Sequence, residues 1–185
     1  MMSLLLSRRI VFAVAFSLNC GCVKLLLPNS HVVDVLTPVL DEISKWIQID
    51  PNSPESGGYI AGYEHKTTNN IVLENVSRPY PLDKRNRTRF DMRDPLHKIF
   101  LMKAKKHKSF YMGVWHTHPQ DYPTPSSLDW DDWRRTMESD RTGCDYFFFI
   151  IAGTVYTRIW VGDPNNGSIS ELFECEKTDG VYIRD

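Results

Sequence analysis

The chain has 185 residues, of which 42% are hydrophobic and 24% are charged, and its formal net charge is −1. A chain of this length buries roughly 70% of its unfolded surface, so it can form a core without disulfide staples. The near-zero charge excludes a global field that would attract nucleic acid or acidic membranes. We expect an N-terminal extension over residues 1–22 and a single domain over residues 23–185.

The N-terminus allows two interpretations. Ser7-Arg8-Arg9 and the apolar run over residues 10–18 have the charge and hydrophobicity of a short export signal, although the run is far too short to span a membrane. The same run is rich in β-branched and aromatic side chains, which suit an edge strand turning at Asn19–Gly21 into a strand over residues 23–27. We favour the strand.

The next segment, residues 31–48, has apolar side chains at helical spacing, which predicts a helix after the turn at Pro28-Asn29-Ser30. Pro38 is awkward inside a helix, so an alternative start lies there, with Thr37 as the N-cap.

The remaining elements follow in chain order. We expect strands over residues 58–63 and 70–76, a loop over 79–94 with a short strand at 88–92, a helix over 95–106 with Ile99, Phe100 and Met102 on its apolar side, a strand over 110–118, a helix from Ser126 to about Ser139, and strands over 145–151 and 155–161. This mixture of strands and helices predicts an α/β (α+β) fold, a sheet with helices packed on it, with the run Phe147–Ile151 as a core strand.

The most informative motif is His116-Thr117-His118-Pro119, followed after six residues by Ser126-Ser127-Leu128-Asp129. Residues two apart in a strand share a face, so His116 and His118 would point at one metal ion. Asp129 would return from the next element, and three protein ligands with a fourth position for water are typical of catalytic zinc sites. The alternative is structural, because the second motif is also a helix-capping signal, although a cap does not explain the two histidines.

A glutamate elsewhere in the chain completes this chemistry. Zinc lowers the pKa of a bound water to about 7, but a nearby carboxylate must still accept the proton and pass it to the leaving amine. Glu55 is followed by Ser56-Gly57-Gly58, and glycine lets a strand start tightly against a metal loop. Alone, Glu55 would be interpreted as an exposed loop carboxylate; beside the two histidine and aspartate motifs it becomes the candidate acid/base.

Together, Glu55, the His-x-His-Pro motif and Ser126-x-x-Asp129 resemble the JAMM signature of the JAB/MPN zinc isopeptidases, and the likeness covers roughly residues 23–165. The surrounding sequence is similar to bacterial JAB proteins found beside E1/E2-like enzymes in anti-phage CBASS operons and on integrative elements. The resemblance implies a curved mixed β-sheet flanked by helices. It also implies one Zn²⁺ per chain on His116, His118 and Asp129, with Glu55 as acid/base and Ser126 stabilising the oxyanion.

The same resemblance implies a substrate. It would be a protein with an extended C-terminal tail, a ubiquitin-like protein or a CD-NTase (cGAS-like enzyme), joined to a target lysine by an operon-encoded E1/E2-like partner. The chain would reverse that conjugation in the cytoplasm, with no nucleic-acid or membrane partner. Tyr80, Arg87 and Arg89, with Arg85, lie on the loop before the metal strand and are candidates to clamp the tail; a solvated loop is the alternative.

Other interpretations remain open at this stage. The chain could be a metal-free binding or scaffold module of the same fold, or a processing peptidase for sulfur-carrier or phage-tail proteins. His-Glu-x-x-His helices and the deaminase pattern are absent from the sequence. Asp131 and Asp132 are rivals to Asp129 as ligands.

The other conspicuous side chains have no motif around them. We expect Trp115 and Trp130 to serve packing, and we expect the remaining histidines to lie at the surface: His31, His65, His97 and His107.

Overall fold

The structure is a computed structural model that describes residues 22–178 and 181–184, with side chains described for residues 22–174. The strands are β1 (Cys22–Leu26), β2 (Val32–Leu36), β3 (Gly57–Glu64), β4 (Ile71–Val76), β5 (Lys84–Asn86), β6 (Arg89–Asp91), β7 (Phe110–Thr117), β8 (Phe147–Ala152), β9 (Thr157–Asp163), β10 (Ser168–Leu172), β11 (Cys175–Thr178) and β12 (Val181–Arg184). The helices are α1 (Thr37–Ser44), α2 (Leu96–Lys106) and α3 (Ser127–Ser139). The strand or export signal predicted over residues 7–18 lies outside the described residues, so the boundary of the N-terminal extension stays a prediction.

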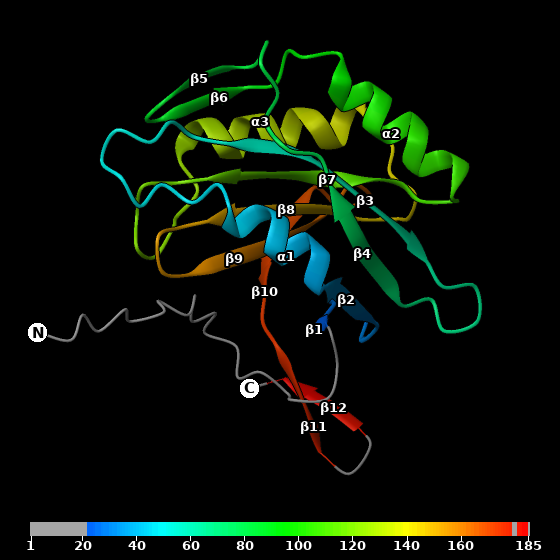
Figure 1. Cartoon of the computed structure of the whole chain (residues 1–185). Helices are drawn as coiled ribbons and strands as arrows, with labels where there is room; N and C mark the ends of the chain where they lie inside the picture. Colours follow the sequence, from blue (N-terminus) through cyan, green and yellow to red (C-terminus); the bar gives the residue numbers. More distant parts are fainter. Residues whose placement is uncertain (1–21, 179–180, 185) are drawn as a thin grey trace, which may run out of the picture.

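Eight strands form one mixed sheet in the order β1-β2-β4-β3-β7-β8-β9-β10 (Figure 1). The pairs β2–β4 and β7–β8 are parallel, and the other neighbours are antiparallel. The sheet curves so strongly that its two edge strands approach each other, with a bridge between Leu25 and Glu174. The predicted fold class, a curved mixed sheet with helices packed on it, is confirmed.

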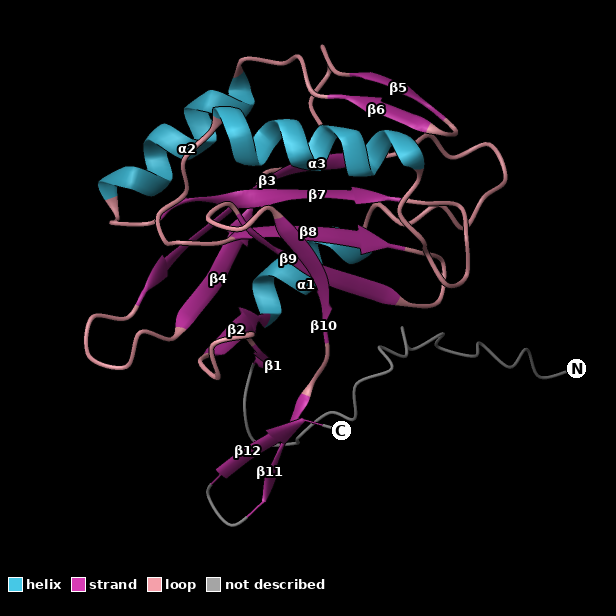
Figure 2. Ribbon diagram, turned by 180° about the vertical axis from the view of Figure 1, so that it is seen from behind, coloured by secondary structure: helices cyan, strands magenta, loops and turns pink. Residues whose placement is uncertain are grey.

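The helices cover both faces of this sheet. Helix α1 lies against one face, whereas α2, α3 and the hairpin β5–β6 lie on the other (Figures 1 and 2). No helix in the described part of the chain is both long and apolar enough to cross a membrane.

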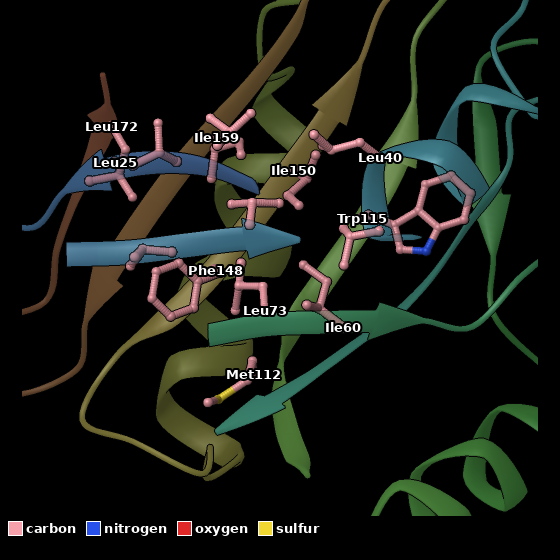
Figure 3. Close-up of a cluster of buried hydrophobic side chains, with 14 of the residues drawn as sticks. Leu25, Leu40, Ile60, Leu73, Met112, Trp115, Phe148, Ile150, Ile159 and Leu172 are labelled. Atoms are coloured by element: carbon pink, nitrogen blue, oxygen red, sulfur yellow. The ribbon is translucent and has the colours of Figure 1, made fainter. Parts of the chain in front are cut away.

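The larger core fills the space between the sheet and α1 (Figure 3). Its buried side chains include Leu25, Leu40, Ile60, Leu73, Met112, Trp115, Phe148, Ile150, Ile159 and Leu172. Complete burial of each large apolar side chain contributes roughly 1.5–3 kcal/mol, so this cluster is the main source of stability. The expectation that Trp115 serves packing is confirmed.

A second core lies on the α3 side. Trp133 stacks on Phe149 with the ring centroids 4.5 Å apart, and Met137 and Trp160 close the cluster. Trp130 packs against it at its margin, as predicted. Every residue of β8 is buried because the strand contributes side chains to both cores, which confirms its assignment as a core strand.

Strand β7 contains a bulge. Against β3, Ile60 pairs with Gly113 while the next residue, Ala61, pairs with Tyr111, so Met112 is an extra residue without a cross-strand partner. Gly113 has a φ of +149°, and a Cβ added there would lie 1.9 Å from the carbonyl oxygen of a residue in β8. Only glycine fits the bulge at this position.

The bulge changes which side chains of β7 face each core. Met112 and Trp115 both point into the α1-side core, while Tyr111 and Val114 pack on the α3 side. Regular alternation resumes after the bulge, so His116 emerges on the α3 side.

The predicted helix over residues 31–48 is wrong in its first half, where residues 32–36 form β2 between β1 and β4. Three of these five residues are valines, and burial of β-branched side chains in a sheet outweighs their helical spacing. Helix α1 begins close to the alternative start at Pro38. Thr37 as N-cap is wrong, because Leu36 occupies that position and makes no side-chain cap bond.

The apolar side predicted for the helix over residues 95–106 is wrong for two of its three residues, while Phe100 is half-buried. Ile99 and Met102 are exposed, at 42% and 66%, and the buried residue of α2 is His97. The strands β10, β11 and β12 were not predicted, because no motif or strong periodicity marks the tail.

His97 was expected at the surface, and that expectation is wrong. Its ring is 1% exposed, with Nδ1 2.8 Å from Ser77 Oγ and Nε2 2.8 Å from Asp83 Oδ2. Asp83 Oδ1 also accepts the backbone N–H groups of Arg93 and Asp94, both at 2.9 Å. The buried imidazole therefore ties the loop over residues 79–94 to the end of β4, which sequence periodicity could not reveal.

The bulge generates a prediction about stability. Gly113→Ala should destabilise the fold by about 3 kcal/mol or more, because it adds a clash with β8 to an unfavourable φ. The free energy of unfolding from urea titration measures this loss. Gly167→Ala is the matched control, since Gly167 has a φ of +70° and nothing within 4 Å of an added Cβ. It should cost only about 1–2 kcal/mol, and equal losses in both variants would contradict the clash.

Candidate metal centre

Three predicted ligands converge on one point. His116 Nε2 lies 3.0 Å from His118 Nε2 and 3.1 Å from Asp129 Oδ1, and His118 Nε2 lies 3.5 Å from Asp129 Oδ2. Tetrahedral zinc with ligand bonds of about 2.0–2.1 Å requires its ligand atoms about 3.3 Å apart. The chemistry and spacing of the three donors therefore fit a zinc ion.

The local structure explains this convergence. His116 is near the end of β7, and His118 follows the strand while its N–H continues the pairing with β8 through Ala152 O at 2.9 Å. Thr117 points to the opposite face and is fully buried. Asp129 comes from the first turn of α3, which packs on the same face of the sheet as the imidazoles.

Ser126 holds Asp129 in place through a reciprocal cap. The backbone N–H and the hydroxyl of Ser126 donate to Asp129 Oδ2 at 2.6 and 2.7 Å, and Ser126 Oγ accepts the N–H of Asp129 at 3.2 Å. Oδ1 is left to face His116. The capping interpretation and the ligand interpretation are therefore both compatible with this geometry, because Oδ1 takes no part in the cap.

The rival carboxylates lie elsewhere on α3. Asp131 and Asp132 are exposed and form ion pairs with Arg134 and Arg135. Neither belongs to the cluster of ligand atoms that Asp129 forms with the two histidines.

Asp129 and His118 shift each other's pKa. Burial disfavours ionisation of Asp129, but hydrogen bonds from His116, His118 and Ser126 outweigh it and hold its pKa far below the usual range. Burial would lower the pKa of His118, yet the hydrogen bond and charge of Asp129 raise it overall. An ionised carboxylate beside two imidazoles is a cation-binding arrangement.

Glu55 lies beside this cluster. Its side chain is nearly buried, and Oε1 is 4.0 Å from His118 Nε2. Burial raises the pKa of Glu55 to about 7; the charge of Asp129 adds to that rise, while His118 and Arg89 oppose it. A carboxyl group with a pKa near neutrality can both accept and release a proton at physiological pH.

A buried network that the sequence did not suggest supports the segment before β3. The Thr117 hydroxyl accepts the N–H of Ser56 at 3.0 Å and donates to Gln48 Oε1 at 3.2 Å. Gln48 Nε2 in turn donates to the carbonyls of Ser53 and Arg87, at 2.9 and 2.8 Å. Thr117, which lies between the two histidines, is thus connected to Ser56 directly and to Ser53 through Gln48, on either side of Glu55.

Gln120 is a second residue that sequence reasoning missed. Its Oε1 lies 3.4 Å from His118 Nδ1 and accepts the N–H of Thr124 at 2.9 Å. An acceptor at Nδ1 favours the tautomer with its proton there, which leaves Nε2 free to bind a metal. Only an amide or carboxylate two residues after a predicted ligand could have signalled this role.

The cluster opens into a groove with a volume of about 650 Å³. On one side lie residues 88–93, which include β6, and on the other lies α3 from Leu128 to Ser139. Val114 of β7 forms part of its apolar floor. Among the four residues predicted to clamp a substrate tail, Arg89 lines the groove.

Tyr80, Arg85 and Arg87 do not line it. Tyr80 packs its ring against His97 at 4.7 Å, and the exposed Arg87 contributes only its carbonyl to the Gln48 network. Their role in substrate binding stays a prediction.

The position of Gln120 generates a prediction about metal binding. Gln120→Ala should weaken zinc affinity about 10–100-fold, as loss of a second-sphere acceptor does in other zinc sites. Competition titration against a chromogenic chelator measures the affinity. Gln120→Glu keeps an acceptor oxygen and should bind zinc nearly as tightly as the wild type. Wild-type zinc affinity in Gln120→Ala would contradict the role of Gln120 in metal binding.

Comparison with known proteins identifies relatives of this chain. An isopeptidase from Vibrio cholerae that is named CD-NTase/cGAS isopeptidase is 32% identical over 114 residues, which cover 60% of this chain and 72% of the relative. A protein of the same name from Escherichia coli is 28% identical over 147 residues, covering 78% of this chain and 88% of the relative.

Among solved structures, a protein from Desulfitobacterium hafniense matches 74% of this chain and 87% of its own with a TM-score of 0.51 at 20% identity, which supports the fold. Residues 36–163 match the family described as prokaryotic homologues of the JAB domain, a span that includes all five motif residues. The resemblance noted in the sequence is confirmed, and the chain belongs to the family of prokaryotic JAB-domain homologues.

Proposed function

We propose that this protein is a zinc-dependent isopeptidase that removes a protein attached through its C-terminus to a lysine of another protein. The observation that carries the proposal is the approach of a nearly buried carboxyl group, Glu55, to the cluster of His116, His118 and Asp129 inside one groove. A scaffold module of the same fold would need neither the ligand cluster nor the glutamate.

His116, His118 and Asp129 would hold the metal. Zinc bound there would polarise the scissile carbonyl and lower the pKa of a water molecule, as it does in other hydrolases. The chain's own contribution is to fix the two imidazoles on one face of β7 and to present Asp129 Oδ1 to them from the cap of α3.

Glu55 would carry the proton. With a pKa raised to about 7, its carboxylate accepts a proton from the attacking water and releases it to the departing lysine amine. Its burial excludes bulk water, which keeps the proton within the site.

Ser126 has two roles in this proposal. Its hydroxyl donates to Asp129 Oδ2, so it orients a ligand. Stabilisation of an oxyanion would require the same hydroxyl proton to turn from that carboxylate to the substrate, since a hydroxyl has only one proton to donate.

The groove suits an extended tail. Strand β6 lines it and pairs only with β5 among the described strands, so its other edge could pair with a substrate backbone. Arg89 lies on this strand and would contact the tail. Because relatives are named CD-NTase/cGAS isopeptidases, we propose a CD-NTase tail as the substrate, conjugated by E1/E2-like partners in the bacterial cytoplasm.

The metal site has a direct test. Elemental analysis should find about one zinc per wild-type chain, and none in His118→Ala, because two ligands bind zinc far more weakly than three. A chelator should abolish hydrolysis, and added zinc should restore it. A wild type that neither contains nor gains zinc would favour the metal-free scaffold.

The role of Glu55 has a separate test. Glu55→Gln should keep its zinc and lose about 10²–10⁴-fold in turnover, since the amide cannot carry a proton. The probe is a CD-NTase joined by its C-terminal carboxyl to a reporter lysine, with cleavage followed on gels. Unchanged turnover would refute the acid/base assignment. Cleavage of only a linear tail fusion, with the lysine conjugate left intact, would favour a processing peptidase.

A further inference from the structure

We propose that Arg85 is a positioning residue for catalysis, which holds the backbone around Glu55 so that its carboxyl group stays beside the metal ligands. This inference rests on the proposed function. It gives Arg85 a role different from the substrate clamp expected for the loop before β7.

The guanidinium of Arg85 contacts three consecutive residues. Its Nε donates to the carbonyl of Glu55 at 2.7 Å, and its Nη2 donates to the Ser56 hydroxyl and, at 3.5 Å, to the carbonyl of Pro54. These bonds go to the main chain and to a buried hydroxyl, not to the carboxylate of Glu55. The side chain therefore fixes where the glutamate stands and does not pair with its charge.

The backbone of β5 also bonds to Glu55. The N–H of Glu55 donates to the carbonyl of Asn86 at 2.7 Å, so both peptide groups of the glutamate bond to residues of one short strand. Arg85 is itself anchored, because its guanidinium carbon lies 5.5 Å from the centre of the Trp46 ring. Loss of this side chain would free the carbonyl side of Glu55.

Arg85 lies outside the groove, but the hairpin joins it to the groove wall. In the β5–β6 pairing Arg85 is opposite Phe90, which lines the groove. Gly57, two residues after Glu55, packs so closely on the Phe90 ring that an added Cβ would lie 2.7 Å from it. One strand of the hairpin therefore faces the substrate while the other sets the position of the proton carrier.

Lysine cannot replace this function. A guanidinium presents several donors in a fixed plane, whereas an ammonium is a point charge on a flexible stem. A displacement of about 1 Å at a reacting group can lower the rate about 10²-fold. Arg85→Lys and Arg85→Ala should therefore both lower kcat by roughly 10–100-fold, with KM and zinc affinity within about twofold of the wild type.

The experiment compares these variants with Lys84→Ala on the CD-NTase–lysine conjugate. Lys84 precedes Arg85 on β5 and its side chain is exposed and outside the groove, so Lys84→Ala should keep wild-type kcat. Arg85→Lys keeps the positive charge and the aliphatic part of the side chain. It is the variant to measure if Arg85→Ala unfolds. Wild-type kcat in Arg85→Ala, or a raised KM with kcat intact, would overturn the proposal.

A second readout separates positioning from general stability. If Arg85 acts through Glu55, adding Arg85→Ala to Glu55→Gln should leave the residual turnover unchanged. A further 10-fold or greater loss in that background would overturn the inference. Failure of the proposed function is distinguishable, because it would appear as wild-type protein that does not cleave the conjugate.

Discussion

The alternation of side chains along β7 is the constraint on which the rest of the site depends. This strand lies in the middle of the sheet and is covered on both faces, so each side chain after Phe110 lies either on the α1 side or on the α3 side. Trp115 and Thr117 face α1, and His116 and His118 consequently emerge together beside α3. A shift of one residue would bury the imidazoles in the apolar core and expose Trp115.

Two features position the side chains of the site. One is the bulge at Gly113, and the other is the set of hydrogen bonds that hold the backbone around Glu55. The bulge sets which face the histidines occupy, at the cost of a backbone conformation that only glycine accepts. Contacts of the segment around Glu55 with Arg85 and Thr117 bring Glu55 to the same face, although it precedes His116 by 61 residues in the chain. Together they fix the distance between Glu55 and the cluster of His116, His118 and Asp129.

The sequence predicted the cluster of His116, His118 and Asp129, and most strands, because these features follow local rules. The period of two in a strand is enough to bring His116 and His118 together, and Ser126-x-x-Asp129 reports a cap that is independent of the rest of the fold. The sequence-based predictions were wrong where burial against distant segments determines the local structure. The valines of β2 have helical spacing but gain more from two strand neighbours, and His97 is buried only because Asp83 and Ser77 meet it from distant segments.

The two carboxyl groups of the site illustrate how environment divides chemical roles. Asp129 stands at the N-terminus of α3, where the helix dipole, the cap and two imidazoles all favour its ionised form. Glu55 lies close by but is bonded mainly through its backbone, so burial dominates and raises its pKa to about 7. One carboxylate is therefore suited to stay charged as a ligand, and the other is suited to exchange protons. Exchanging the two residue types would not exchange these roles, because the difference resides in the hydrogen bonds that the fold supplies to each position.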